Sequence, residues 1–132
     1  MPPKLSETRL LPSNKRRDHL SDVVENCDRI ARHVAGLSRK EYLRDEKTID
    51  AVEHCLQRIS EAAYKLGAGL DGLYPDAPWK AARGIGNILR HKYDQVSHDL
   101  IWASLQRDVP RLRRSAVAEI ERLKRSESDE AG

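Results

Sequence analysis

The chain has 132 residues, of which 39% are hydrophobic and 34% charged, with no Phe, a formal net charge of +3 and a pI near 9.0. This length fits one domain with a modest core, and high charge with few aromatic residues is typical of a helical protein. No run approaches the roughly 20 apolar residues of a membrane span, and no signal peptide is recognisable, so we expect a cytoplasmic protein without membrane contact.

The N-terminal third of the chain predicts an arm followed by helices. Residues 1–14 contain three prolines, mixed charges and no periodicity, which indicates a flexible N-terminal arm. A helix is predicted at about 16–35 because apolar residues recur there at intervals of three and four, and Gly36 is placed to end it. Ser38 and Glu41 have the spacing of a capping box, which predicts another helix start.

The middle of the chain predicts two further helices around a loop. The same apolar spacing predicts a long helix at about 45–67. The segment GAGLDGLYPDAP follows, and its glycines and prolines predict the main loop of the domain. A third helix is predicted from Pro78 or Trp79 to about Lys92, and a fourth begins at Ser97 or His98.

The C-terminal part is predicted to be helical with a break. Pro110 should interrupt or kink the fourth helix, because proline lacks an amide proton and collides with the preceding turn. A last amphipathic segment ends near Leu123, and residues 126–132 are predicted to be a flexible tail. No window shows the period-two alternation of a strand. The fold is therefore predicted to be all-α, an up-down bundle of four to five helices within residues 15–125.

Several residues outside the helix pattern receive structural interpretations. Cys27 and Cys55 are the only cysteines, and both are predicted to be reduced thiols in the core. Because the chain lacks the paired Cys and His spacing of a zinc site, the sequence indicates neither a metal nor another cofactor. Trp79 and Trp102 are predicted to be core or interface anchors. His98 shows no partner pattern and is taken as an ordinary surface or core residue.

The helix predicted at about 78–92 concentrates polar side chains on one face. On a helical wheel they fall within an arc of about 100°, with apolar residues mostly opposite. The polar set comprises Arg83, Asn87, Arg90, His91 and, if the helix continues, Asp94. Tyr93 points away from His91 or lies in the turn beyond it, since residues two apart on a helix do not face each other.

This combination of residues suits RNA cleavage in which the 2′-hydroxyl attacks the adjacent phosphate. His91 can donate or accept the proton near neutral pH. An arginine can hold the phosphate with two-pronged geometry, and Asn87 can orient the histidine or a phosphate oxygen. Two such faces across a dimer would form one cleft with two histidines. Spacing alone leaves the alternative open that this is an ordinary solvated basic face.

Three segments of the chain carry a family resemblance: HLSDVVENCDRIARHVAGLSRKEYLRDEKTIDAVEHCLQRISEAAYKL, YPDAPWKAARGIGNILRHKYDQV and DLIWASLQRDVPRL. The whole span from about 18 to 124, which contains these segments, resembles the HepT family of HEPN-domain toxins. The resemblance implies a small helical ribonuclease that is the toxin of a two-gene toxin–antitoxin module. It also implies a homodimer with the active cleft at its interface. The implied antitoxin is an MntA-like nucleotidyltransferase, which binds the toxin and transfers AMP from ATP to a tyrosine.

The family motif reads Arg, a polar residue, three further residues, His, any residue, Tyr. Carried over to this chain, the polar residue is Asn87, the histidine is His91 and the AMP-accepting tyrosine is Tyr93. The motif arginine would fall at position 86, where this chain has Gly86. A close approach of two helices at that position would explain a glycine inside a helix.

Three functions fit these residues. The first is a metal-independent endo- or exoribonuclease toxin that acts on RNA, by resemblance on transfer RNA. His91 is its general acid/base and Asn87 its orienting residue, and Arg83 or Arg90 clamps the phosphate. The second is a catalytically inactive HEPN-like module that binds RNA or a nucleotide, which Gly86 favours. The third is a structural partner of a nucleotidyltransferase.

Overall fold

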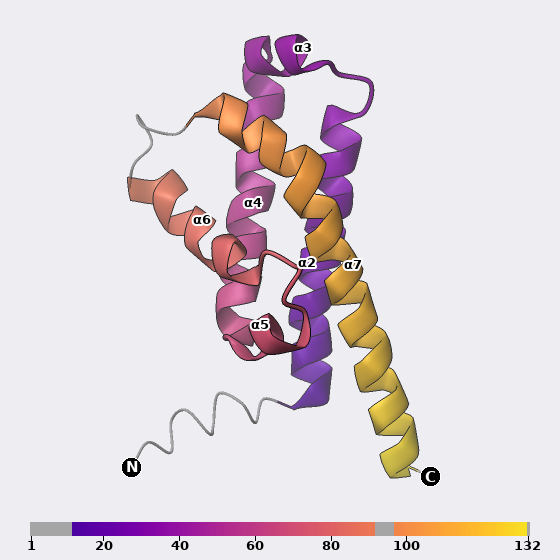
Figure 1. Cartoon of the computed structure of the whole chain (residues 1–132). Helices are drawn as coiled ribbons and strands as arrows, with labels where there is room; N and C mark the ends of the chain where they lie inside the picture. The colour runs from indigo at the N-terminus through magenta and orange to yellow at the C-terminus, as the bar shows by residue number, and fades with distance from the viewer. Residues whose placement is uncertain (1–11, 92–96, 132) are drawn as a thin grey trace.

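The computed structural model describes residues 12–91 and 97–131, in which every regular element is helical. The helices are α2 (Ser13–Val34), α3 (Arg39–Arg44), α4 (Glu46–Leu66), α5 (Gly69–Leu73), α6 (Trp79–His91) and α7 (His98–Ala131). The long helices α2 and α4 lie side by side, and α6 packs on α4 while α7 packs on α2 (Figure 1). The predicted all-α class is confirmed. No described helix offers a stretch both long and apolar enough for a membrane crossing.

The predicted signals around Gly36 and Ser38 are confirmed. α2 ends at Val34, and Gly36 follows with a φ of 78°, a left-handed conformation that glycine adopts without strain. Ser38 Oγ accepts the Glu41 N–H at 3.1 Å, and the Glu41 carboxylate accepts the Ser38 N–H at 2.9 Å. This capping box starts α3, and the chain then turns back so that α4 runs along α2 (Figure 1).

Local signals also bound α4, close to the predicted range of about 45–67. Asp45 Oδ1 accepts the Thr48 N–H at 3.1 Å, and Asp45 Oδ2 accepts the Thr48 hydroxyl at 2.8 Å. These hydrogen bonds lower the pKa of Asp45, because they favour its charged form. Gly67 follows the last residue of α4 with a φ of 75° and ends the helix.

The segment after Gly67 is not one continuous loop, as the sequence had suggested. It contains the short helix α5, Gly69–Leu73, in which Leu70 is 1% exposed. The burial of Leu70 explains the difference, because one apolar side chain docked in the core holds a turn that its glycines do not favour.

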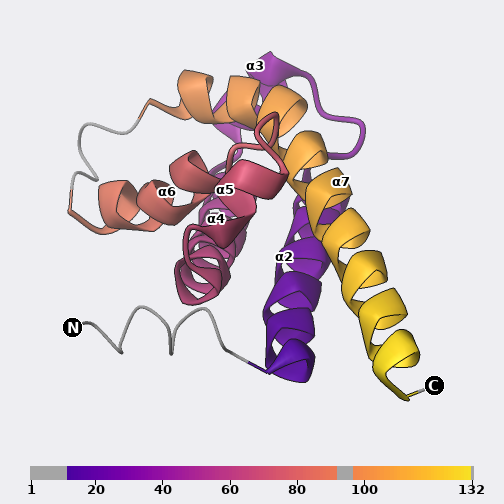
Figure 2. The same ribbon diagram turned by 60° about the horizontal axis from the view of Figure 1, so that its bottom comes forward.

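α7 is a single helix of 34 residues that passes through Pro110. The sequence predicted that Pro110 would interrupt or kink this helix, and the interruption is not found. Pro110 is exposed, while Val109 and Leu112 are buried. The backbone hydrogen bond that proline cannot donate is therefore lost on the solvent-facing side of the helix. The buried residues before and after Pro110 keep the helix continuous by packing in the core. α7 changes direction along its length, as expected of a helix with an internal proline (Figures 1 and 2).

The helical part of the chain reaches further toward the C-terminus than the predicted domain of residues 15–125. α7 continues to Ala131, past the boundary predicted at residue 125. Arg17 of α2 donates from Nε to Glu127 Oε2 at 2.8 Å and ties this part of α7 to the start of α2. Residues 1–11, most of the predicted N-terminal arm, lie outside the described part of the chain.

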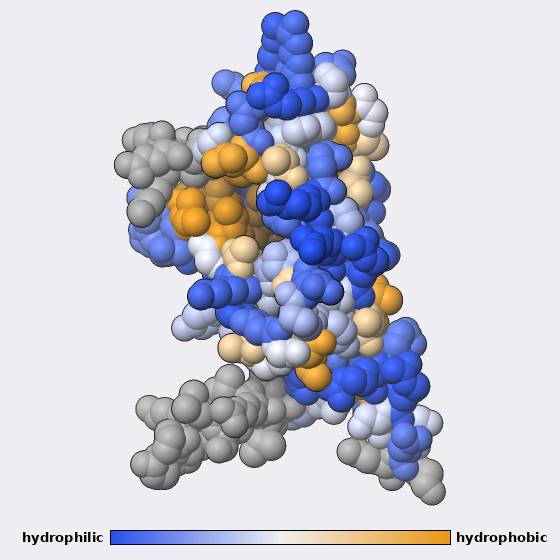
Figure 3. All heavy atoms as spheres, viewed as in Figure 1, coloured by the Kyte–Doolittle hydropathy of each residue, from blue (hydrophilic) through white to orange (hydrophobic). Residues whose placement is uncertain are grey.

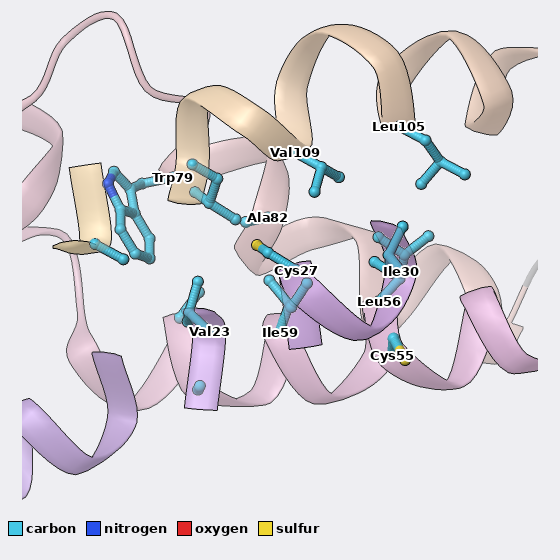
Figure 4. Close-up of a cluster of buried hydrophobic side chains, with 14 of the residues drawn as sticks. Val23, Cys27, Ile30, Cys55, Leu56, Ile59, Trp79, Ala82, Leu105 and Val109 are labelled. Atoms are coloured by element: carbon cyan, nitrogen blue, oxygen red, sulfur yellow. The ribbon is translucent and has the colours of Figure 1, made fainter. Parts of the chain in front are cut away.

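The core forms where α2, α4, α6 and α7 meet (Figure 4). Trp79 at the start of α6 is 1% exposed, and Tyr42 of α3 is buried with its ring centroid 5.0 Å from that of Trp102. Cys27 and Cys55 are buried free thiols, as predicted. Burial raises the pKa of Cys27 to about 12, so this thiol stays protonated and unreactive.

One buried carboxylate, Glu119 of α7, joins three parts of the bundle. Its Oε1 accepts from Arg122 Nε at 2.8 Å and from the Tyr74 hydroxyl at 2.9 Å. Its Oε2 accepts from Arg122 Nη2 at 2.7 Å and from Arg16 Nη2 at 3.2 Å. Burial alone would raise the pKa of Glu119, but the hydrogen bonds, led by those from Arg122, outweigh it and hold the pKa below its ordinary value.

We expect Glu119→Gln to lower the free energy of unfolding at pH 7 by about 2–3 kcal/mol, because an amide does not replace a carboxylate bound by two guanidiniums. The folded-state pKa of Glu119 is depressed, so its stabilisation is present above the unfolded-state value of about 4.3 and is lost as the pH falls below it. Urea unfolding at several pH values should therefore show that the difference in free energy of unfolding between the wild type and Glu119→Gln becomes smaller as the pH falls from neutral to acidic. Glu121→Gln, at an exposed neighbour, is the control. Equal losses in both variants would contradict the role of Glu119.

Candidate active site

α6 packs an inner face on α4 and turns its polar residues outward. The inner positions recur at intervals of three and four and are all buried: Trp79, Ala82, Gly86 and Leu89. Because successive residues are about 100° apart, the positions between them turn away from α4, and most are exposed, although Arg83 and Ile85 are half-buried. Asn87, Arg90 and His91 are exposed, in the direction that the sequence predicted.

Gly86 lies at a close contact between α6 and α4, as predicted. Its N–H donates to Ser60 Oγ at 3.1 Å, and the same hydroxyl donates to the Arg83 carbonyl at 2.9 Å. A Cβ added to Gly86 would stand 2.7 Å from Ser60 Oγ and 2.9 Å from Ser60 Cβ, closer than atoms can approach. Position 86 therefore has no room for a side chain while Ser60 faces it.

Arg83 is engaged within the fold. Its Nη1 donates to Asp71 Oδ1 at 2.8 Å and its Nη2 to Asp71 Oδ2 at 2.7 Å, and Nη1 also donates to the Gly67 carbonyl at 3.2 Å. The hydrogen bonds from Arg83 lower the pKa of Asp71. This two-pronged pair ties α6 to α5 and to the end of α4, so Arg83 already has an anionic partner.

Arg90, the other candidate cation, has a different environment. Within residues 12–91 and 97–131, no carboxylate forms an ion pair with it. Its Nη1 lies 3.2 Å from the point where a Cβ on Gly86 would stand. The guanidinium thus folds back by one helical turn and occupies the space beside the bare Gly86 backbone.

Asn87, Arg90 and His91 share the last turns of α6. Asn87 and His91 are four residues apart, which places them on one face of the helix. Asp94, which the sequence placed on the same face if the helix continues, and Tyr93, predicted to point away from His91 or to lie in the turn beyond it, are outside the described residues. In the described part of the chain, no group of three or more His, Cys, Asp or Glu side chains is arranged to hold a metal ion. The groups collected here are an amide, a guanidinium and an imidazole.

An apolar hollow of about 170 Å³ lies between α6 and the first half of α7 (Figure 3). The three residues predicted to form the apolar side of α6 have different environments. Leu89 is buried, Ile85 lines the hollow, and Ile88 is 44% exposed. Leu100, which also lines the hollow, is 73% exposed. Grouped exposed apolar side chains of this kind mark a surface suited to protein contact.

Sequence reasoning missed one polar pair at the start of α7. His98, for which no partner was predicted, has its Nδ1 3.2 Å from Oε2 of the buried Glu53. Burial raises the pKa of Glu53, and the nearby His98 opposes that shift. The two residues are far apart in the sequence, and no local pattern links them.

Comparison with known proteins shows which family this chain resembles over the region that includes α6. The family described as Ribonuclease HepT-like matches residues 23–119, which include all of α6. "Putative RNase MJ0127" of Methanocaldococcus jannaschii is 30% identical over 113 residues, covering 86% of this chain and 90% of that protein. "Probable ribonuclease HepT" of Thermococcus cleftensis is 28% identical over 97 residues, covering 74% of this chain and 88% of that protein. No solved structure matches the chain.

We expect Gly86→Ala to lower the free energy of unfolding by about 1–3 kcal/mol, because its methyl group overlaps Ser60 in a packed contact. Gly84→Ala is the matched control on the same helix, where a Cβ meets nothing within 4 Å. That change should raise the free energy of unfolding by up to about 1 kcal/mol through helix propensity. Urea unfolding of the two variants checks the difference in sign.

A second substitution tests whether Ser60 causes the strain. Ser60→Gly removes both atoms that an added Cβ at position 86 would meet within 3 Å. Gly86→Ala should therefore destabilise the Ser60→Gly background much less than it destabilises the wild type. An equal loss in both backgrounds would mean that the contact has been assigned to the wrong neighbour.

Proposed function

Because the chain belongs to the HepT-like ribonuclease family, we propose that it is a metal-independent ribonuclease and the toxin of a toxin–antitoxin module. The observation that carries the proposal is the guanidinium of Arg90, which lies against Gly86 and is open to a ligand. Position 86 is where the family motif has its arginine. The Cα of Arg90 is one helical turn further along α6, but its guanidinium lies close to position 86. It therefore puts a positive charge near the position of the motif arginine, on the same helix as Asn87 and His91.

In the proposed reaction, the 2′-hydroxyl of the RNA attacks the adjacent phosphorus and the bond to the 5′-oxygen breaks. The products are a 2′,3′-cyclic phosphate and a free 5′-hydroxyl. His91 takes the proton from the 2′-hydroxyl or, when protonated, gives one to the leaving oxygen. Arg90 binds the phosphate oxygens on which charge develops, and Asn87 orients the phosphate or the imidazole.

A homodimer would supply both proton-transfer roles. One imidazole does not act as base and acid in the same step, whereas two copies of His91 facing one cleft can divide the roles. The exposed Ile88 and Leu100 beside α6 support such an assembly, because a second copy of the chain would remove this apolar surface from water.

The proposed substrate is cytoplasmic RNA, and the family resemblance favours transfer RNA. The proposed antitoxin is an MntA-like nucleotidyltransferase that binds the toxin and transfers AMP to Tyr93. Since Tyr93 is two residues after His91 in the chain, an AMP group there would add bulk and negative charge near the phosphate-binding residues. Repulsion of the RNA backbone would then inhibit the toxin.

Gly86 supports a second candidate function, a HEPN-like module that binds RNA or a nucleotide without cleaving it. Arg90 approaches the phosphate site from a different Cα than the motif arginine. A clamp displaced by about 1 Å can lower a rate by about a hundredfold, while binding persists. A third candidate, a structural partner of the nucleotidyltransferase, needs neither cleavage nor RNA binding.

We expect His91→Ala to slow RNA cleavage by about 10²–10⁴-fold, the usual contribution of a general acid/base. Arg90→Ala should slow it by about 10²–10³-fold, and Arg90→Lys should recover only part, because an ammonium lacks the two-pronged fork. The assay is cleavage of total cellular RNA by purified protein in EDTA. Arg114→Ala, at an exposed arginine of α7, is the control and should cleave like the wild type.

The outcomes separate the three candidates. Unchanged cleavage by His91→Ala would overturn the proposed ribonuclease mechanism. RNA binding without cleavage by the wild type would establish the binding module. Absence of both, with a stable complex between the chain and a nucleotidyltransferase, would leave the structural partner.

We expect incubation with the nucleotidyltransferase and ATP to add the mass of one or more AMP units to Tyr93. Mass spectrometry of proteolytic peptides locates the modification. Tyr93→Phe should remain unmodified, whereas Tyr64→Phe, at a tyrosine that is 75% exposed, should be modified like the wild type. AMP on Tyr64, or on no tyrosine, would count against this part of the proposal.

A further inference from the structure

The outward side of α6 carries a polar stripe that reaches from its first turn to its last residue. Lys80, Gly84, Asn87 and His91 are spaced at four, three and four residues, which places them within an arc of about 60°. All four are exposed. α6 contains no acidic residue, so this outer stripe begins and ends with a basic group.

Gly84, in the middle of the outer stripe, has no close packing contact at its Cβ position among residues 12–91 and 97–131. A Cβ built on it meets nothing within 4 Å, and its φ is not left-handed. A glycine inside a helix destabilises it by about 1 kcal/mol relative to alanine. At Gly86, two residues further on, the close contact with Ser60 compensates for this lower helix stability. Gly84 has no such contact among the described residues. The helix thus exposes bare backbone at the centre of its polar face.

Lys80 is the second residue of the outer stripe that does not contribute to the stability of α6. It lies in the first turn of α6, where the helix dipole disfavours a cation. The nearby Asp71 is already bound by both prongs of Arg83, and no ion pair with Lys80 forms among the described residues. Its ammonium therefore stands in solvent as a positive charge that an external anion can reach.

We propose that the outer stripe is the track of a single-stranded RNA substrate, with Lys80 binding a second phosphate further along the same strand. The strand runs along α6 and passes closely over Gly84, where no side chain intervenes, to reach Asn87 and His91. Lys80 and His91 are eleven positions apart, about 16 Å along the helix axis, so Lys80 contacts a phosphate more than one nucleotide away from the scissile one. The inference rests on the proposed function, because it takes His91 as the reacting end of the track.

The polarity of the outer stripe favours RNA over a second protein helix as its occupant. Lysine, asparagine and histidine offer partners for phosphates, riboses and base edges. The outer stripe itself contains no apolar side chain: Ile85 and the exposed Leu100 line the hollow toward α7, and on a helical wheel the exposed Ile88 falls between that hollow and the stripe. A single strand is favoured over a duplex, because the attacking 2′-hydroxyl must come into line with the leaving oxygen.

Binding of a labelled single-stranded oligouridylate, measured in a His91→Ala background, tests the track independently of cleavage. Gly84→Gln places a neutral, helix-favouring side chain on the track and should weaken binding by about tenfold or more, or about 1.4 kcal/mol. The same change should leave the free energy of unfolding undiminished. Lys80→Gln should reduce the slope of log affinity against log salt by about 0.7, the value for one phosphate of a single strand.

Matched controls lie on other helices. Gly72→Gln alters an exposed glycine of α5 that also has open space around its Cβ position, and Lys124→Gln removes an exposed charge from the far half of α7. Both should bind RNA with the parent affinity and salt slope. Sedimentation of each variant reports whether the oligomeric state changes.

Each result decides the matter. Parent-like binding by Gly84→Gln and Lys80→Gln would overturn the track, as would a failure of the parent to bind RNA. A change of oligomeric state in Gly84→Gln with unaltered RNA affinity would assign the outer stripe to a protein partner and overturn it too. If the two substitutions weaken binding as expected but the wild type does not cleave RNA, the track stands and the proposed catalytic function fails.

Discussion

The contact between Ser60 of α4 and Gly86 of α6 fixes how α6 sits in the bundle. One hydroxyl accepts the Gly86 N–H and donates to the Arg83 carbonyl, so it holds both the depth and the rotation of the helix. Trp79, buried at the first turn, opposes any rotation because the indole would enter water. The exposure of Asn87 and His91 follows from this rotation, and the candidate chemistry of α6 therefore depends on a packing contact on its opposite side.

Two arginines of α6 show that position on a helix does not settle what a long side chain does. Arg83 and Arg90 fall on the same side of a helical wheel. Arg83 reaches Asp71 and serves the fold, whereas Arg90 turns back over Gly86 without an anionic partner among the described residues. A phosphate would have to compete with the Asp71 carboxylate for the first guanidinium, whereas no carboxylate among the described residues pairs with the second.

Local signals in the sequence were sufficient for most of the helix boundaries. Gly36, the Ser38 capping box and Gly67 act through bonds or torsion angles within a few residues, and each is confirmed. The differences arise where distant residues decide. Leu70 turns a glycine-rich segment into α5 by reaching the core, and Val109 with its buried neighbours carries α7 through a proline.

The candidate site divides in the same way. A helical wheel indicated which positions of α6 face outward, because that direction depends only on spacing. It did not indicate where the guanidiniums point, since the partner of Arg83 comes from α5 and has no periodic relation to it. The opposition of Ser60 to Gly86 is likewise a contact between two helices, and only the fold brings them together.

Gly86 and Arg90 are best understood as one feature. A Cβ at position 86 would meet Ser60 on one side and come within 3.2 Å of Arg90 Nη1 on the other. The overlap with Ser60 rules out a side chain at 86 in this arrangement, and the Arg90 guanidinium would have to shift by a few tenths of an ångström to make room for one. The glycine that removes the motif arginine also creates the space into which Arg90 returns. Gly84 differs because no described residue comes within 4 Å of its Cβ position, so the space beside it is open within the described part of the chain.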